Sequence, residues 1–289
     1  MKIRFQRVSA GFMAMSTECS IITYAKSAKH GEFAIGEAIK EVRRIEKKYS
    51  RFDQDSVISV INRDSWNAPV AVDRETALLL DFSAVCSEQS GGVFDITCGS
   101  LYRVWQSGRA VLPSVDEVHE ALRHVGWKNV KWDGEFISLA TDQMRLDFGG
   151  IGKEYAADRA LAVLKESGIH FAMVNFGGDI AVLGGKPDGT GWLIGVKHES
   201  GFENRSGSDV IVAGQVIEAW QGGIATSGTN ERFIEINDIR FSHLMNAVSG
   251  WPLVGDVSFT VTHSSCLAAG ALASQRLLSL NQSGVMKSL

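Results

Sequence analysis

Apolar side chains recur at the three- and four-residue spacing of an α-helix in five stretches of the chain, and each stretch predicts a helix. The third predicted helix has a marked start, because Ser114 follows Pro113 and stands three residues before Glu117, as in a capping box. Gly168 is expected to end the fourth. The five predicted helices span residues 33–49, 75–89, 116–126, 153–167 and 265–280.

Shorter runs between these stretches alternate apolar and polar residues, which is typical of half-buried antiparallel strands. Turn dipeptides at 133–134 and 237–238 each separate two such runs. Helices and strands do not alternate regularly, so we predict an α+β fold with antiparallel sheets covered by helices, and not a doubly wound sheet. The runs lie at 18–25, 129–134, 136–141, 171–176, 180–185, 192–197, 209–220, 232–236, 239–244 and 256–263.

Composition narrows the class of partner. The 289 residues, 45% of them hydrophobic, suffice for a full core, and neither a repeat nor a linker divides them, so we expect one domain over residues 1–289. The net charge is −4, and the densest basic cluster, at 40–48, contains glutamates, which argues against nucleic acid as a partner. We see neither a signal peptide nor a membrane span and expect a cytoplasmic protein. The four scattered cysteines predict neither a disulfide framework nor a zinc site.

The segment Leu146–Asp158, LDFGGIGKEYAAD, carries the strongest local signal. Glycines directly after a strand allow a sharp turn and leave room for a ligand beside the backbone. The start of the following helix offers N–H groups to an anion, and Lys153 adds a mobile positive charge. The segment therefore resembles a phosphate site in outline. An ordinary strand–turn–helix junction with an exposed lysine is the alternative.

Two further glycine clusters follow strands or precede turns. In NFGGD, Asn175 and Asp179 could cap backbone groups or hold a ribose or ring edge. In TSG, Thr226 and the later Arg232 suit a polar ligand face, although a surface turn is equally consistent.

Two other segments place a titratable side chain beside a turn. In GGVFDITCG, Asp95 could accept a hydrogen bond from a ligand N–H or cap a helix that leads to Leu101. His243, in RFSHLMNAVSG, could act as a general base near neutral pH, although a lone histidine at the end of a strand is more often structural.

The order of these segments resembles that of the FAD:protein FMN transferases, the ApbE-like proteins. LDFGGIGKEYAAD resembles the family block LDLGGIAKGYAVD, and six other blocks follow the family order from Met15 to the last helix. They are AMSTECSI, SRFDQDSVISVIN, GGVFDITCGSLYRVW, MVNFGGDIAVLG, IATSGTNERF and FSHLMNAVSGWPL.

The resemblance implies two packed tunnelling-fold-like halves with FAD between them and Mg²⁺ on its pyrophosphate. It implies transfer of FMN onto a threonine or serine of a partner flavoprotein, with release of AMP. His243 would activate the acceptor hydroxyl, and the carbonyl of Ala156 would face the metal. The residues expected at the FAD site are Met15, Phe52, Val93, Phe94, Asp95, Lys153, Asp158 and Thr226.

Departures from the family pattern concern the metal. The last helix of the family carries D-x-x-x-T, whereas this chain has Gly270 and Ser274 at those positions, and Asn246-Ala247 replaces the Asp-Pro after the histidine. Ala156, Gly270 and Ser274 would form an entirely neutral surrounding, so we expect weak Mg²⁺ binding without FAD and a gain in metal affinity from Gly270→Asp. A flavin-binding or flavin-delivery protein without transferase activity and an FAD pyrophosphatase are the alternative functions.

Overall fold

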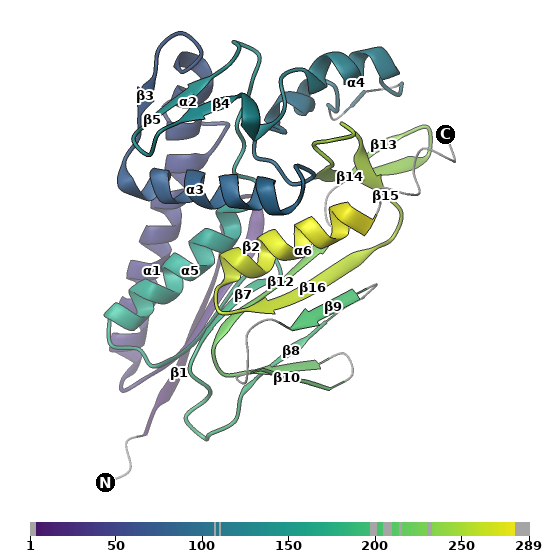
Figure 1. Cartoon of the computed structure of the whole chain (residues 1–289). Helices are drawn as coiled ribbons and strands as arrows, with labels where there is room; N and C mark the ends of the chain where they lie inside the picture. Colours follow the sequence, from purple (N-terminus) through teal and green to yellow (C-terminus); the bar gives the residue numbers. More distant parts are fainter. Residues whose placement is uncertain are drawn as a thin grey trace. The chain divides into compact units, whose positions relative to one another are not determined.

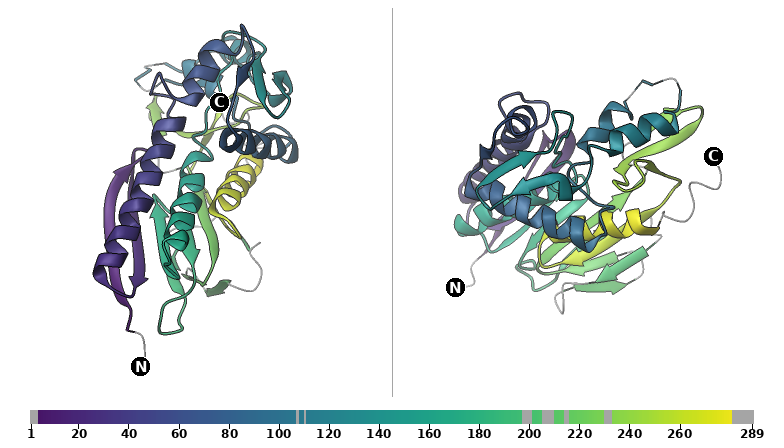
Figure 2. Two further views of the ribbon diagram at one scale, coloured as in Figure 1. Left: turned by 90° about the vertical axis from the view of Figure 1, so that its left-hand side faces the viewer. Right: turned by 45° about the horizontal axis from the view of Figure 1, so that its top comes forward.

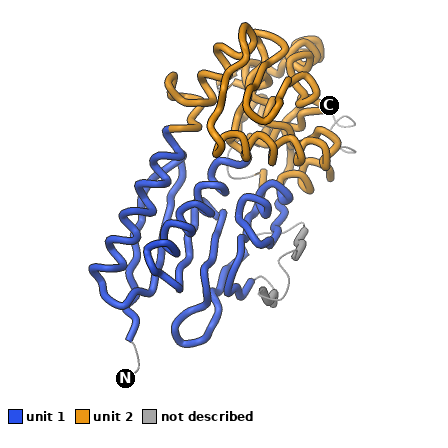
Figure 3. Tube along the Cα trace, turned by 60° about the vertical axis from the view of Figure 1, so that its left-hand side comes forward, with its two compact units in different colours: residues 1–47, 151–227, 258–273 blue, residues 48–150, 228–257, 274–289 orange. Residues whose placement is uncertain are grey.

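A computed structural model describes residues 4–106, 108–109, 111–196, 201–204, 210–213, 216–229 and 233–280. The chain forms two compact units (Figure 3). Unit 1 comprises Met1–Lys47, Ile151–Ser227 and Ser258–Ala273, and unit 2 comprises Lys48–Gly150, Gly228–Val257 and Ser274–Leu289. Because the chain passes between the units after residues 47, 150, 227, 257 and 273, a single cut does not separate them.

Unit 1 is built on a seven-stranded sheet in the order β1-β2-β6-β7-β12-β16-β9 (Figure 1). The pairings from β1 to β12 are antiparallel, and β16 pairs with β9 in parallel. A second sheet has the order β10-β11-β8. The strands are β1 (Gln6–Ala14), β2 (Thr17–Ala25), β6 (Phe171–Phe176), β7 (Asp179–Leu183), β8 (Trp192–Gly195), β9 (Gly201–Asn204), β10 (Val210–Ala213), β11 (Val216–Ala219), β12 (Gly222–Gly228) and β16 (Ser258–His263).

The two faces of the large sheet have different cover. Helices α1 (Ala28–Tyr49) and α5 (Gly152–Glu166) run along the strands (Figure 2), and α5 packs on β6 and β7. The smaller sheet covers the other face through a cluster that includes Val182, Trp192 and Ile217. Side chains alternate between the faces along a strand, so Asp179 and Ala181 of β7 lie on the face opposite to Val182. Helix α6 (Cys266–Leu280) begins in unit 1 and ends in unit 2.

Unit 2 is mainly helical, with two small sheets in the orders β3-β5-β4 and β13-β14-β15. Its core centres on Trp105, whose ring packs against Phe241 and Trp251 and whose Nε1 donates to the carbonyl of Gly250 at 2.8 Å. Its elements are α2 (Val57–Asp64), β3 (Val70–Ala71), α3 (Arg74–Gln89), the 3₁₀ helices η1 (Gly99–Arg103) and η2 (Trp127–Asn129), α4 (Val115–Leu122), β4 (Val130–Trp132), β5 (Phe136–Leu139), β13 (Phe233–Ile236), β14 (Ile239–Met245) and β15 (Pro252–Val254).

The predicted α+β class is confirmed, and all five predicted helices are present. The capping box at Ser114 and Glu117 has both of its hydrogen bonds, and Asn237 and Asp238 form a hairpin turn with φ of 52° and 62°. The β-rich run predicted over 209–220 contains two strands, β10 and β11, which pair antiparallel. The patterns missed helix α2 and strands β1, β3, β9, β12 and β15. The single-domain boundary and the tunnelling-fold-like halves stay predictions.

We expect Gly250→Ala to destabilise unit 2. Gly250 has a φ of 74°, and a Cβ there would lie 2.6 Å from the Val118 side chain, so strain of at least about 1–2 kcal/mol adds to a collision in the core. Gly91→Ala is the matched control, because Gly91 has a φ of 63° with nothing within 4 Å of the added Cβ. Thermal unfolding of both variants measures the difference, and equal losses of stability would contradict the packing argument.

Candidate functional site

The loop before α5 is held in unit 2 by one carboxylate. Asp147 accepts from the Gly149 N–H at 2.8 Å through Oδ1 and from Arg51 at 2.8 Å through Oδ2. The Arg51 guanidinium also lies 4.1 Å from the Tyr102 ring centroid and 4.8 Å from that of Phe52. Phe52 is 81% exposed, so one face of this cluster presents to solvent an aromatic ring held by a cation. Sequence reasoning missed Arg51.

Val93 and Phe94 fix the same loop to its neighbours in unit 2. Both side chains are buried, and a Cβ at Gly150 would lie 3.2 Å from the Phe94 ring. Gly150 therefore allows the ring to approach the backbone of the loop closely. The Val93 carbonyl accepts from the Ala247 N–H at 3.1 Å. Both side chains pack in the interior of unit 2. The Val93 carbonyl is already hydrogen-bonded to the Ala247 N–H.

Protein donors occupy the acceptor positions of the Asp95 carboxylate. Its Oδ1 accepts from the backbone and hydroxyl of Thr97 at 2.9 and 2.7 Å. Its Oδ2 accepts from the Ser87 hydroxyl at 2.8 Å and the Trp127 N–H at 2.7 Å. A carboxylate has about four acceptor positions, so the capping alternative describes this side chain.

Lys153 joins the two glycine motifs in unit 1. Its Nζ lies 2.7 Å from Oδ2 of Asp179, a residue 26 positions away that is almost fully buried. The expectation of a mobile lysine is therefore wrong, because the carboxylate holds the ammonium group. Asn175 caps the intervening turn, accepting from the Gly178 N–H at 2.8 Å. No described side chain caps the start of α5 at Ile151, which suits an anion at that terminus.

Asp158 connects α5 to the start of α6 within unit 1. Its two oxygens accept from the N–H groups of Cys266 at 2.8 Å and Leu267 at 2.9 Å. Helix N-terminal amides lack intrahelical partners, so this carboxylate stabilises α6 both by hydrogen bonding and through the helix dipole. Burial nevertheless raises the pKa of Asp158, and the two backbone hydrogen bonds oppose that shift.

One turn earlier on α5, Glu154 lies against Gly270 of α6. A Cβ built at Gly270 would lie 2.5 Å from Cγ and 3.0 Å from Oε1 of Glu154. The expectation of an entirely neutral surrounding is therefore wrong, because a carboxylate occupies the space beside Gly270. The Gly270→Asp expectation also needs revision, since the added side chain would collide with Glu154.

The Glu154 carboxylate is poorly compensated. The residue is 6% exposed, and its Oε2 has no hydrogen-bond partner among the described residues. Burial first, and then the charge of Asp179, raises the pKa of the Glu154 carboxyl. Burial also raises the pKa of Asp179, although Lys153 opposes the shift. A cation at this place would relieve the cost of a buried carboxylate.

The remaining predicted residues are divided between the units. Met15 and Thr226 belong to unit 1 and His243 and Ser274 to unit 2. Met15 has a φ of 50° in the turn from β1 to β2, and its N–H donates to Glu46 at 2.5 Å. The Thr226 hydroxyl lies 2.8 Å from that of Thr260. Arg232 lies outside the described residues.

His243 and Ser274 have different surroundings. His243 is exposed on β14, and its role as a general base stays a prediction. Ser274 is buried one helical turn after Gly270, and Ala156 is buried inside α5. The described residues include no cluster of three or more His, Cys, Asp or Glu side chains able to hold a metal ion. A cation bound beside Glu154 would therefore need further oxygens from the backbone, from a hydroxyl or from a ligand.

Asn246, which stands where the family has aspartate, still stabilises the turn that follows it. The side-chain oxygen of Asn246 accepts from the N–H groups of Val248 and Ser249, each at 3.0 Å. An amide oxygen thus does what one oxygen of an aspartate would do in this turn. The next residue, Ala247, provides the N–H that bonds Val93, which a proline lacks.

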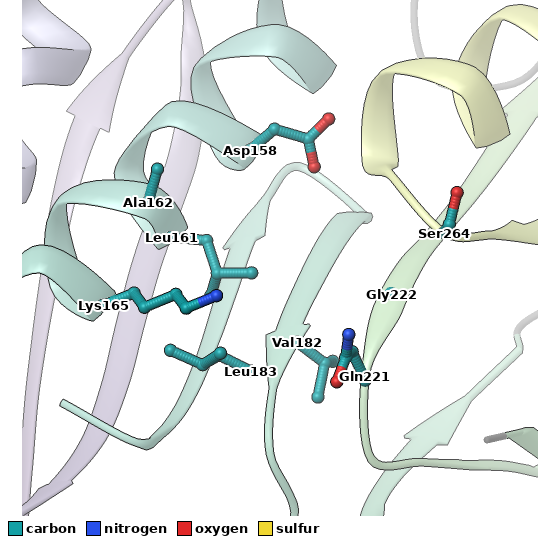
Figure 4. A pocket seen from close by; sticks show the side chains of 9 residues that line it. All are labelled: Asp158, Leu161, Ala162, Lys165, Val182, Leu183, Gln221, Gly222 and Ser264. Carbon is teal, nitrogen blue, oxygen red and sulfur yellow. The ribbon is translucent and has the colours of Figure 1, made fainter.

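An open pocket of about 200 Å³ lies on unit 1 between α5, β7 and the turn before α6 (Figure 4). Asp158 and Lys165 of α5 line it, together with Leu161, Val182 and Ser264. Asp158 is the predicted site residue among them, and its oxygens are engaged with α6. The pocket therefore adds no reactive group to the candidate site.

We expect Asp158→Asn to lower the thermal stability of unit 1 by about 1–2 kcal/mol, because α6 loses a charged cap. Ser265→Ala is the comparison, since the Ser265 hydroxyl accepts from Ala268 N–H at 3.2 Å at the same helix terminus. Thermal unfolding and FAD affinity should both be measured. Unchanged unfolding with weakened FAD binding would show that Asp158 acts on the ligand and not on α6.

Curated relatives of this chain share one description. An FAD:protein FMN transferase of Treponema pallidum is 27% identical over 274 residues, covering 89% of this chain and 74% of the relative. An FAD:protein FMN transferase of Vibrio cholerae is 28% identical over 237 residues, covering 80% and 69%.

Solved structures agree with the fold. The ApbE protein of Thermotoga maritima has a TM-score of 0.83 at 30% identity, covering 96% of this chain and 88% of that one. The flavin transferase ApbE of Vibrio cholerae has a TM-score of 0.80 at 22% identity, covering 95% and 87%, which supports the fold alone. The family model described as ApbE matches residues 15–285, nearly the whole chain. The chain therefore belongs to the ApbE family.

Proposed function

We propose that this protein transfers FMN from FAD onto the hydroxyl of a threonine or serine in a partner flavoprotein and releases AMP. The observation that carries the proposal is the family match over residues 15–285, which includes both units and His243. Relatives described as FAD:protein FMN transferases, at 27% and 28% identity, support the same reaction.

The transfer is a displacement at the phosphorus of the FMN half of FAD. The acceptor oxygen forms a bond to this phosphorus, and the bond to the oxygen bridging the two phosphates breaks. The bridging oxygen leaves with its electron pair as part of AMP. His243 takes the proton of the acceptor hydroxyl, which its exposure on β14 allows, since the acceptor is itself a protein.

The residues predicted at the FAD site are divided between the two units. The exposed Phe52 ring, held beside Arg51, suits a face of the flavin. Met15 is a further predicted lining residue, whereas the packing of Val93 and Phe94 and the hydrogen bonds of Asp95 favour an indirect role for these three in shaping the site. Lys153 and the α5 N-terminus suit the pyrophosphate, and Asp158 is predicted at the phosphate and ribose end of FAD. Thr226 is a further residue predicted at the FAD site.

Magnesium fits the residues present, although Gly270 brings no carboxylate. Glu154 has a buried carboxylate oxygen without a partner beside Gly270, and Mg²⁺ favours carboxylate and phosphate oxygens. The Ala156 carbonyl and the Ser274 hydroxyl are the other proposed ligands. When bound, Mg²⁺ neutralises charge on the pyrophosphate.

The proposal includes a cytoplasmic location for this protein. All four cysteines are unpaired, which is in keeping with a reducing compartment. Burial raises the pKa of Cys19 to about 11 and of Cys86 to about 12, so these thiols are not nucleophiles at neutral pH. Across the described part of the chain, none of the helices combines the length and apolar character that a bilayer span requires.

Incubation with FAD, Mg²⁺ and a flavin acceptor domain distinguishes the proposed function from the two alternatives. Covalent FMN on the acceptor supports transfer. Free FMN together with AMP, without labelled acceptor, supports a pyrophosphatase instead. Unchanged FAD bound to the protein supports flavin binding alone, and either of the last two results would contradict the proposal.

We expect His243→Ala to reduce the transfer rate by about 10²–10⁴-fold, because the acceptor hydroxyl loses its base. FAD affinity, measured by flavin fluorescence, should stay nearly unchanged. His119→Ala is the matched control, since His119 is also an exposed histidine of unit 2. A His243→Ala variant that transfers FMN at the normal rate would show that the base is another residue.

A further inference from the structure

The chain departs from the family pattern at two positions, one of which gains a carboxylate while the other loses one. The family block LDLGGIAKGYAVD has glycine where this chain has Glu154, and the last helix of the family has aspartate where this chain has Gly270. One carboxylate is lost from α6 and one is gained on α5. The sequence alone does not connect the two changes, because they lie 116 positions apart (270 − 154).

The structure brings the two positions into contact within unit 1. Any Cβ at position 270 would lie 2.5 Å from Cγ of Glu154, so the two side chains compete for one space. Asp158 fixes how the two helices are aligned, because it accepts hydrogen bonds from the first amides of α6. Asp158 lies one helical turn from Glu154 on α5, and Cys266 lies one helical turn from Gly270 on α6. The Glu154 carboxylate therefore occupies the volume that an aspartate at 270 would enter.

One oxygen of this carboxylate has no hydrogen-bond partner among the described residues, and the charge of Lys153 only partly opposes the effect of burial on the pKa of the carboxyl. It is 94% buried (6% exposed), and its Oε2 accepts no hydrogen bond from the described residues. The adjacent Lys153 is bound to Asp179 at 2.7 Å. A buried ionisable oxygen without a donor is unfavourable, and coordination of a hard cation is one arrangement that satisfies it.

We propose that Glu154 supplies, from α5, the carboxylate ligand of the divalent cation that the family aspartate supplies from the last helix. The exchange of Gly for Glu at 154 and of Asp for Gly at 270 moves the ligand between helices and keeps one negative charge. This inference rests on the proposed function, because the cation is expected to bind together with the pyrophosphate of FAD.

Binding of Mn²⁺, followed by its electron paramagnetic resonance signal with and without FAD, tests the proposal. Glu154→Gln keeps the shape of the side chain and removes its charge, so Mn²⁺ affinity should fall at least about tenfold. The rise in melting temperature that Mn²⁺ gives the unmodified protein should also be lost. FAD affinity in EDTA should stay within about twofold, because the metal is absent from both samples.

Two further variants control for packing. Glu41→Gln makes the same substitution in unit 1 at a glutamate that is bound to Arg44 and Arg159, and it should leave Mn²⁺ affinity unchanged. The double variant Glu154→Gly with Gly270→Asp recreates the family arrangement, with the carboxylate on α6. It should bind Mn²⁺ more tightly than Glu154→Gln does. Gly270→Asp alone should destabilise the protein, because two carboxylates would share one space.

The outcomes separate this inference from the proposed function. Normal Mn²⁺ binding by Glu154→Gln, or absence of Mn²⁺ binding by the unmodified protein with FAD, would overturn the role of Glu154 even if FMN transfer occurs. Mn²⁺ binding that depends on Glu154, without labelling of any acceptor, would leave the metal ligand in place and reject the transferase.

Discussion

The two hydrogen bonds that Asp158 accepts from the first amides of α6 fix how α6 lies against α5 within unit 1. They attach α6 to α5 at one point, and helical geometry then carries the register along both helices. Glu154 meets Gly270 one turn from that point, and Ala156 lies between Glu154 and Asp158 on the same helix. A charged group that accepts two backbone N–H groups makes this attachment both strong and directional.

The large elements could be predicted because their patterns are local. The run at 171–176 is a strand with those bounds, and the capping box locates the start of α4 within one residue. Helix α2 was missed because it directly follows a polar run, although Ser56 caps it by accepting from the Ser59 N–H. Strand β12 was missed because small residues dominate it, and their burial depends on neighbours.

The sequence could identify candidate site residues but not their interaction partners. The glycine motifs identified Lys153 and Asp179 as candidates, yet their ion pair links two elements whose approach is a tertiary property. Asp95 looked equally suited to ligand binding and capping until its four donors were known. The Asn246-Ala247 departure likewise gains meaning only from the structure, which provides turn capping and a bond to Val93.

The contact between positions 154 and 270 has a consequence for how members of this family should be compared. A side chain at one position excludes a bulky residue at the other, so the two sites are constrained as a pair and should covary. A sequence with both carboxylates crowds two charges together, and a sequence with neither leaves the space empty. An alignment that scores position 270 alone would therefore classify chains of this type as degenerate, although the pair conserves a single acid.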